Sequence, residues 1–190
     1  MTKIISAPNP VLSAVAKKYP FTKDPKNDKA LGKLLSDMEY ALLNASDPKG
    51  VGLAAPQIGL SFAIFIAKPT NKSKISVFIN PKILDTKTPN NPNFPNRPRN
   101  KKPKRLEGCL SLPTIWGEVK RLDSVTLQYF NETGKKRLKT FRGFMATIVQ
   151  HEVDHLNGIL FPKRVLEQKG QLYQSKKDEK GEDIFEEITI

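Results

Sequence analysis

Two histidines with a glutamate between them, His151, Glu152 and His155, are the residues of this 190-residue chain that most directly suggest chemistry. On a helix, residues four apart share one face, so both imidazoles could bind one metal ion. Glu152, beside the first histidine, could then act on a water molecule at that metal. The same spacing also arises from packing or by chance, and the pair alone is evenly balanced between these interpretations.

Two further observations favour a metal site. The chain contains no other histidine, and Phe144 and Ile148 continue the same helical stripe at the spacing i, i+4, i+7, i+11. An apolar wall leading to a metal is the pocket that an enzyme for apolar side chains needs. We therefore expect residues 144–156 to form a central, largely buried helix, which Gly158 ends with a left-handed cap.

A catalytic metal commonly has three protein ligands and an open position, so two histidines leave the site one ligand short. Cys109, the only cysteine of the chain, is the best candidate for the third ligand. Gly108 gives the backbone freedom near a metal, and the N–H of Leu110 could point at a developing oxyanion. The alternative is a buried structural cysteine, which is the commoner fate of a lone cysteine.

A third segment, Gly50 to Gln57, contains two glycines and two alanines, which permit close approach of the backbone. Gln57 adds an uncharged amide donor. This loop by itself is weak evidence, because small residues before a strand are ordinary.

Together the three segments resemble the peptide deformylases, whose pattern is a G-x-G-x-A-A-x-Q loop, an E-G-C-x-S segment and an H-E-x-D-H helix, in that order. Residues 50–57, 107–111 and 151–155 match these patterns completely. The surrounding chain is similar from about Pro8 to about Pro162. The resemblance implies hydrolysis of the formyl group from the formyl-methionine of nascent polypeptides, which releases formate and a free methionyl N-terminus.

The resemblance also implies roles for single residues. Glu152 is expected to be the catalytic acid and base, and the expected metal ligands are Cys109, His151 and His155. The other positions that the family pattern assigns are the oxyanion donors, on the Gln57 side chain and the Leu110 N–H, and the substrate-binding residues Val51, Gly52, Phe144 and Ile148.

Two residues near the site extend this comparison. Arg121 and Asp154 occupy places that are close together in the family, so we predict a charge-assisted hydrogen bond between them that orients the helix. Trp116 stands where some members carry a basic residue near the downstream substrate backbone. Contacts beyond the first substrate residue are therefore expected to differ.

The expected cofactor is one divalent metal ion. The resemblance implies Fe2+ as the physiological metal, with Zn2+, Ni2+ or Co2+ able to occupy the site, and the sequence alone does not choose among them. A thiolate ligand fits the reducing cytosol and is vulnerable to oxygen. We therefore expect the iron form to lose activity in air.

Helices and strands must position these residues. The patterns predict an α+β fold in which antiparallel strands pack around the central metal-binding helix. Asn131 to Gly134 is predicted to be a hairpin turn, and Pro81 is predicted to end the second strand. Besides the helix at 144–156, we predict an amphipathic helix at 29–45 and strands at 62–67, 75–79, 124–130, 137–141, 171–175 and 183–188.

Length and an apolar content of 38% predict a single domain over residues 1–190. A Pro/Asn/basic loop is expected to interrupt it at about 86–105, and a charged C-terminal extension is expected from about 164. No apolar run is long enough to span a membrane, and no signal peptide or Arg/Ser-rich leader is visible. We expect a cytoplasmic protein, bacterial by default, with no membrane partner.

The formal charge of +13 invites a nucleic-acid interpretation. The densest basic cluster, Arg97 to Arg105, lies in the Pro/Asn-rich loop. No aromatic stacking platform or known nucleic-acid motif accompanies it, which favours a solvated loop. We expect N-formyl-methionyl nascent peptides as partners and no specific recognition of nucleic acid. The basic cluster could still support a transient contact with the ribosome.

Two other functions stay open at this point. A zinc endopeptidase uses the same two-histidine helix, but its third ligand is usually a downstream His, Glu or Asp rather than an upstream cysteine. A non-enzymatic RNA- or ribosome-binding module would use the basic loop. Cleavage of internal peptide bonds would indicate the first. Ribosome binding that is insensitive to salt, or absent, after neutralisation of the Arg97 to Arg105 charges would argue against the second.

Overall fold

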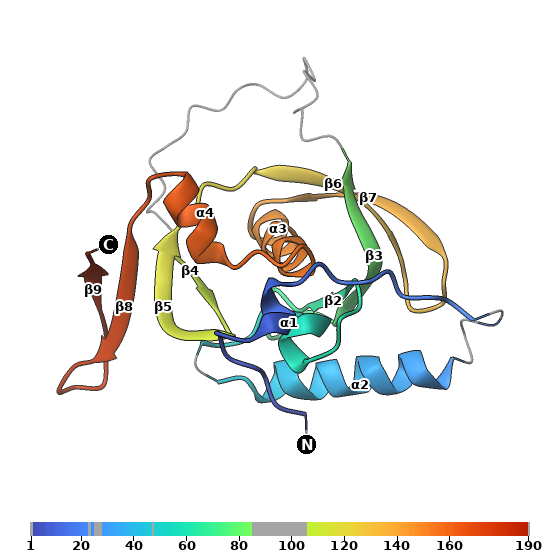
Figure 1. The fold of residues 1–190 in the computed structure, drawn as a ribbon, viewed down its shortest axis with the longest axis horizontal. Coiled ribbons are helices and arrows are strands. Elements are labelled where there is room, and N and C mark those ends of the chain that lie inside the picture. The colour runs from blue at the N-terminus through green and yellow to red at the C-terminus, as the bar shows by residue number, and fades with distance from the viewer. Residues whose placement is uncertain (1, 23, 25–27, 47, 85–105, 190) are drawn as a thin grey trace, which may run out of the picture.

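The structure, a computed structural model, describes residues 2–22, 24, 28–46, 48–84 and 106–189. It confirms the predicted α+β fold, with two antiparallel sheets and helix α3 at the centre (Figure 1). In chain order the elements are α1 (Pro10–Ser13), α2 (Lys29–Asn44), β1 (Gly52–Ala54), the 3-10 helix η2 (Ala55–Ile58), β2 (Ile64–Ala67), β3 (Ser76–Leu84), β4 (Leu106–Cys109), β5 (Leu112–Glu118), β6 (Ser124–Phe130), β7 (Lys136–Arg142), α3 (Phe144–Leu156), α4 (Phe161–Glu167), β8 (Leu172–Lys177) and β9 (Asp183–Ile188).

Helix α3 spans the residues that the apolar stripe predicts. Most of its length is buried, including the polar residues Glu152, Asp154 and His155. The predicted left-handed cap is present, because Gly158 has a φ of 68°. The N–H groups of Gly158 and Ile159 donate to the carbonyls of His155 and Asp154 at 3.1 and 2.9 Å. This pair of bonds is a Schellman motif, and it satisfies the last carbonyls of the helix.

The five-stranded sheet has the order β1-β2-β3-β6-β7 and a helix on each face. Side chains alternate along a strand, so Ile64 and Ile66 of β2 point to one face and Phe65 points to the other. The two isoleucines pack with the buried stripe of α2, the predicted amphipathic helix. Phe65 packs with Ile148 and Val149 of α3 in a second cluster. The sheet therefore fixes the position of α3 through apolar contacts on one face.

The four-stranded sheet has the order β4-β5-β8-β9 and carries Cys109 at the end of β4. Phe161 and Val165 of α4 pack with Leu172 of β8 and with Cys109. Strands β8 and β9 confirm the two predicted tail strands, and they pair in register from Leu172 opposite Ile188 to Lys177 opposite Asp183. Strand β5 and helix α4 were not predicted, since neither has a strong period of apolar residues.

Strand β3 differs from its prediction, because it runs through Pro81 to Leu84. Its register against β6 shifts between Ile79 and Lys82, and Asn80 has a φ of 49°. A bulge of this kind interrupts the ladder where proline has no N–H to donate, so the strand resumes beyond it. The predicted hairpin is confirmed, with β6 and β7 paired from Ser124 opposite Arg142 to Phe130 opposite Lys136.

The Pro/Asn/basic insertion predicted at 86–105, with the cluster Arg97 to Arg105, lies outside the described residues. The segment from 164, expected to be a charged extension, also supplies the buried residues Val165 and Leu172. Within the described ranges, no helix is long and apolar enough to cross a membrane.

The cap at Gly158 yields a stability prediction. A Cβ at this position would overlap the backbone carbonyl of Ser13, and the positive φ would also strain it. We expect Gly158→Ala to lower the free energy of unfolding by about 3 kcal/mol, measured by urea denaturation. Gly181→Ala is the matched control, because Gly181 has a φ of 79° and no atom within 4 Å of the added Cβ.

Gly181→Ala is therefore expected to lower the free energy of unfolding by about 1 kcal/mol, which is the backbone strain alone. Equal losses in the two variants would show that the contact between the Ser13 carbonyl and the end of α3 is not a close constraint.

Candidate active site

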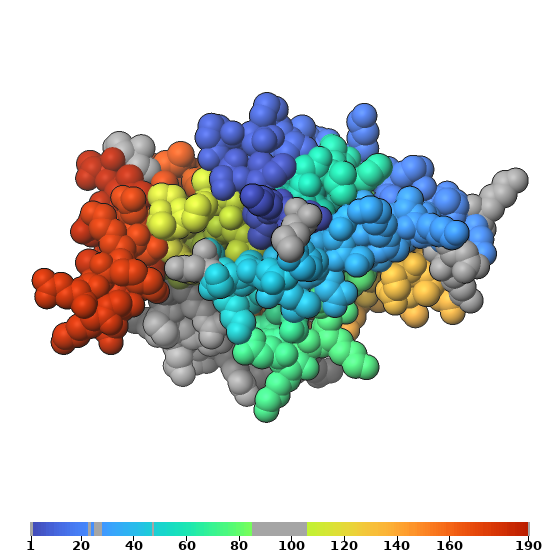
Figure 2. Space-filling model, turned by 90° about the horizontal axis from the view of Figure 1, so that it is seen from below, coloured from blue at the N-terminus to red at the C-terminus, as the bar shows by residue number. Residues whose placement is uncertain are grey.

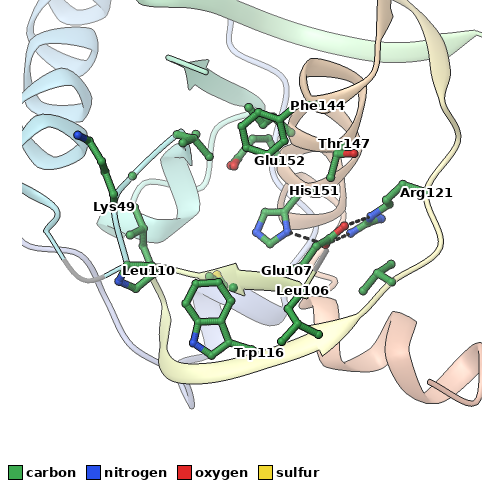
Figure 3. A pocket seen from close by; sticks show the side chains of 18 of the residues that line it. Lys49, Leu106, Glu107, Leu110, Trp116, Arg121, Phe144, Thr147, His151 and Glu152 are labelled. Atoms are coloured by element: carbon green, nitrogen blue, oxygen red, sulfur yellow. Dashed lines mark hydrogen bonds and ion pairs between the residues drawn. The ribbon is translucent and has the colours of Figure 1, made fainter. Parts of the chain in front are cut away.

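A cavity of about 690 Å³ opens beside α3. It is lined by three stretches that are far apart in the sequence, within residues 48–57, 106–121 and 144–152. Figure 3 shows His151 and Glu152 reaching into it from α3, with Trp116 and Leu106 on the side of the four-stranded sheet. The fold thus brings the loop, the cysteine segment and the histidine helix of the sequence pattern around one space.

The three predicted metal ligands lie together. Ligand atoms of Cys109, His151 and His155 are all within 4.8 Å of one another. The Cys109 Sγ lies 3.2 Å from the His155 Nε2, and the two imidazole centroids are 4.9 Å apart. Thiolate and imidazole ligands bind a zinc-like ion at about 2.0–2.3 Å, so groups that share an ion must converge in this way.

The electrostatics of the site suit a cation. Burial by itself lowers the pKa of His151, but hydrogen bonds with Cys109 and Glu107 outweigh it and raise that pKa well above its usual value. Burial and the neighbouring His151 lower the pKa of His155 well below its usual value. The anionic groups around His151 therefore stabilise one positive charge at this place, and a divalent ion supplies positive charge in the same position.

An unpaired buried carboxylate oxygen also fits a site that a ligand engages. Within the described part of the chain, neither the Glu152 Oε2 nor the His155 Nδ1 has a hydrogen-bond partner. Buried polar groups are normally paired, so an unpaired carboxylate oxygen beside two imidazoles indicates a group that a ligand or substrate engages. The soft sulfur and nitrogen donors suit zinc or iron rather than magnesium or calcium.

Glu107 orients the first histidine, a role that the sequence interpretation did not assign. Its Oε2 lies 3.2 Å from the His151 Nδ1, which leaves the other ring nitrogen to face the cavity. A ligand histidine commonly donates its second N–H to a carboxylate in this way. Burial alone would raise the pKa of Glu107, but its hydrogen bonds with His151 and Arg121 lower it. The E-G-C-x-S segment includes Glu107, but the pattern does not predict that Glu107 bonds His151.

The predicted hydrogen bond between Arg121 and Asp154 is confirmed, at 2.6 Å. The same guanidinium donates to both carboxylate oxygens of Glu107, at 2.8 and 2.9 Å. Arg121 therefore joins β4 to α3, the two elements that carry the expected ligands. Arg164 of α4 also donates to Asp154, at 2.7 and 3.1 Å, a contact that no sequence pattern predicted.

Glu152 lies at the inner end of the cavity and is 4% exposed. Burial raises the pKa of its carboxyl group to about 7. Gly52 of β1 makes this position accessible, because a Cβ there would overlap the Glu152 Oε1 and press on Ile148. A side chain that exchanges a proton at neutral pH is suited to general acid–base chemistry. The glycine of the loop is therefore explained by close packing against the glutamate.

Gln57 points its amide nitrogen at the cysteine segment. The N–H of Ala54 donates to the Gln57 Oε1 at 2.9 Å, which fixes the amide. The Gln57 Nε2 then lies 3.6 Å from the Cys109 Sγ and 3.2 Å from the Ser111 Oγ. Leu110 lines the cavity next to Cys109. The two expected oxyanion donors are thus placed on the side of the cavity where Cys109 lies.

The expected substrate-binding residues all line the cavity. Ile148 is buried, whereas Phe144 at the start of α3 is 42% exposed. Val51 and Gly52 lie on the opposite segment, and Ile148 and Val51 both belong to the apolar cluster around α3. The apolar lining of this part of the cavity suits an apolar side chain. Thr147 and Lys49 also line it and were not singled out from the sequence.

Comparison with known proteins agrees with this geometry. A family model described as polypeptide deformylase matches residues 1–171. Peptide deformylase 1 of Bacillus cereus is 38% identical over 163 residues, which cover 86% of this chain and 91% of that protein. Peptide deformylase 1 of Bacillus subtilis is 40% identical over 139 residues, covering 73% of this chain and 76% of that protein.

Solved structures are also similar. The Met-Ala-Ser-bound structure of a class I type b peptide deformylase from Acinetobacter baumannii has a TM-score of 0.67 and 31% identity, covering 85% of this chain and 96% of that chain. The actinonin-bound structure of the class I type b enzyme from the same organism has a TM-score of 0.66 and 32% identity, with coverage of 85% and 95%. A peptide deformylase from Legionella pneumophila has a TM-score of 0.68 and 30% identity, with coverage of 86% and 85%.

The arginine bridge yields a prediction. Removal of Arg121 would leave the buried Glu107 carboxylate with the His151 imidazole but without a guanidinium, whereas Asp154 would keep Arg164. We expect Arg121→Met to lower the free energy of unfolding by about 3–5 kcal/mol. It is also expected to weaken metal affinity by roughly 10- to 100-fold, measured by competition with a chelator.

Arg164→Met is the matched control, because its side chain is 32% exposed and α4 supplies no metal ligand. Arg164→Met is expected to lower the free energy of unfolding by about 1 kcal/mol and to leave metal affinity unchanged. If the two variants lost the same affinity, the bridge from β4 to α3 would have no role in holding the site.

Proposed function

This chain belongs to the polypeptide deformylase family, and from that premise we propose that Glu152 is the catalytic residue in a site formed by Cys109, His151 and His155. The enzyme is a metal-dependent hydrolase that removes the formyl group from nascent polypeptides. The observation that supports the proposed site best is the convergence of the three ligand atoms within 4.8 Å beside the buried Glu152 carboxylate.

The proposed metal ligands are Cys109, His151 and His155, and the proposed metal is ferrous iron. When bound, such an ion acts as a Lewis acid that lowers the pKa of water, in a favourable zinc site from about 15.7 to roughly 7. The donor set suits iron, zinc, nickel or cobalt equally well in chemical type. Ferrous iron follows from the resemblance to the family, and the oxygen sensitivity of a thiolate ligand makes it testable.

We propose that Glu152 moves the proton of the reaction. Its carboxylate takes a proton from the attacking water as the new C–O bond forms at the formyl carbon. It then gives this proton to the amine nitrogen as the C–N bond breaks, so the products are formate and the free amino group of methionine. The raised pKa of about 7 supports this role, because both the acid and the base forms are available at neutral pH.

Two donors are proposed to stabilise the charge that develops on the formyl oxygen. The Gln57 amide is held by Ala54 and directed toward the cysteine segment, and the Leu110 N–H belongs to that segment. Preorganised donors of this kind need no rearrangement during the reaction, and loss of one typically costs roughly 10²- to 10³-fold in rate. The orientation of Gln57 supports the assignment.

The methionine side chain is proposed to bind between Val51, Phe144 and Ile148, with the substrate backbone along Gly52. The apolar lining of this end of the cavity supports the proposal. The similar Acinetobacter baumannii structure that binds Met-Ala-Ser supports binding of a short peptide that begins with methionine. A transient contact with the ribosome, and a cytoplasmic location, stay predictions of the sequence.

The activity is tested by mass spectrometry of formyl-Met-Ala-Ser incubated under argon with iron-loaded protein. We expect loss of the formyl group alone, with every peptide bond intact. The same peptide with an acetyl group at its N-terminus is the control and should be unchanged. Activity of the iron form should decay faster in air than under argon, while the zinc form should be less sensitive to air because zinc is not redox-active.

Cleavage within the peptide would identify an endopeptidase instead. No reaction by fully metal-loaded protein would contradict the proposed site, and equal decay of the iron form in air and argon would contradict the expected oxygen sensitivity of that form.

Glu152 is tested by Glu152→Gln and Glu152→Ala. Because the carboxylate is proposed to move a proton rather than to bind the metal, both variants should retain stoichiometric metal. Their kcat should fall by roughly 10²- to 10⁴-fold. Metal content is measured by elemental analysis and kcat by release of formate. Glu39→Gln, at an exposed position of α2, should leave both unchanged.

A further inference from the structure

Trp116, the only tryptophan of the chain, lies at the boundary between the cavity and the C-terminal hairpin. It is on β5, the strand between β4 and β8 in the four-stranded sheet. Its direct partners across the sheet are Gly108 of β4 and Tyr173 of β8. One edge of the residue therefore meets the segment that carries Cys109, and the other meets the tail of the chain.

Gly108 makes room for the indole. A Cβ at Gly108 would lie 2.8 to 3.1 Å from three carbons of the six-membered ring of Trp116. The ring therefore covers the backbone one residue before Cys109. Figure 3 shows the same ring directed toward the cavity below His151. A substrate residue that extends away from the reacting carbon along this wall would meet the indole.

The hairpin of β8 and β9 holds the other end of the indole. The Trp116 Nε1 donates to the Ser175 Oγ at 3.1 Å. Phe185, paired with Ser175 across the hairpin, packs edge-on against the Trp116 ring with centroids 5.7 Å apart. Trp116, Ser175 and Phe185 lie on one face of the sheet, while the neighbouring Ile184 lies on the other.

The hairpin lies beyond the part of the chain that the family model matches. The family match ends at residue 171, and β8 begins at Leu172. Figure 2 shows the hairpin at one end of the molecule, beside the yellow segment that contains β5. The residues that contact Trp116 from the hairpin, Ser175 and Phe185, therefore lie beyond the region that the family model matches.

We propose that the C-terminal hairpin is a positioning element for substrate binding: Ser175 and Phe185 hold Trp116 as an aromatic wall for the residues that follow the formyl-methionine. This inference rests on the proposed active site. The indole N–H is engaged by Ser175, so the part of the ring that faces the cavity is apolar. The wall should therefore favour an apolar or aromatic substrate side chain over a small polar one.

The test compares kcat and KM for formyl-Met-Ala-Phe, formyl-Met-Ala-Ser and formyl-methionine amide. The enzyme should favour the Phe peptide over the Ser peptide by roughly three- to tenfold in kcat/KM. Phe185→Ala and Ser175→Ala should remove most of this preference by raising KM for the Phe peptide, with a smaller effect on formyl-methionine amide. Phe185→Tyr should restore it.

Ile184→Ala is the matched control. Ile184 and Phe185 are neighbours on β9 with the same exposure of 43%, but Phe185 packs against the Trp116 ring and Ile184 lies on the other face of the sheet. The control should keep the wild-type preference. Equal preferences in Phe185→Ala and Ile184→Ala would overturn the proposal, as would a wild-type enzyme that does not discriminate between the two tripeptides.

Fluorescence of the single tryptophan gives a second measurement that does not depend on turnover. The product peptide Met-Ala-Phe should protect Trp116 from acrylamide quenching more than methionine amide does, and Phe185→Ala should reduce this protection. Equal protection by both ligands would contradict the proposal that Trp116 contacts the residues after methionine. Failure of the enzyme to act on formyl-methionine amide would instead contradict the proposed function, so the two failures are distinct.

Discussion

The ion bridge centred on Arg121 is the interaction on which the site depends. The expected metal ligands come from two elements that no short stretch of chain connects, since Cys109 ends β4 and the histidines belong to α3. Arg121 binds Glu107 on β4 and Asp154 on α3, and Glu107 in turn bonds His151. Charge neutralisation is complete only when sheet and helix are correctly placed, so the bridge couples their relative position to the geometry of the ligands.

Two glycines, Gly52 and Gly108, also shape this cavity. Glu152 occupies the space that a Cβ of Gly52 would fill, and the Trp116 ring occupies the space beside Gly108. The Glu152 carboxylate, proposed to be catalytic, and the Trp116 ring can both approach the backbone only because these two positions have no side chain. The glycines of the sequence patterns are therefore explained by packing between distant segments, and not by turn formation.

The local part of this structure could be predicted from the sequence, and the long-range part could not. The period of apolar residues gave α2 and α3, and residue chemistry gave the cluster of Cys109 with the two histidines. The bond between Arg121 and Asp154 followed from family resemblance. Glu107 as partner of His151, and Arg164 as second partner of Asp154, arise from packing of separate elements. The prediction that Pro81 ends its strand was wrong, because the pairing with β6 has a bulge at this point and the strand continues beyond it.

The position of β9 at the border of its sheet has a consequence for self-association. A border strand offers backbone groups to which a strand of another molecule can add, and natural proteins oppose this with charge. Here Lys176 pairs with Glu186 and Lys177 with Asp183 across the hairpin, and Glu187 adds a further acid to β9. Two like hairpins meeting edge to edge would bring acids against acids. The acids of β9 therefore oppose the addition of a second β9 strand at this border of the sheet.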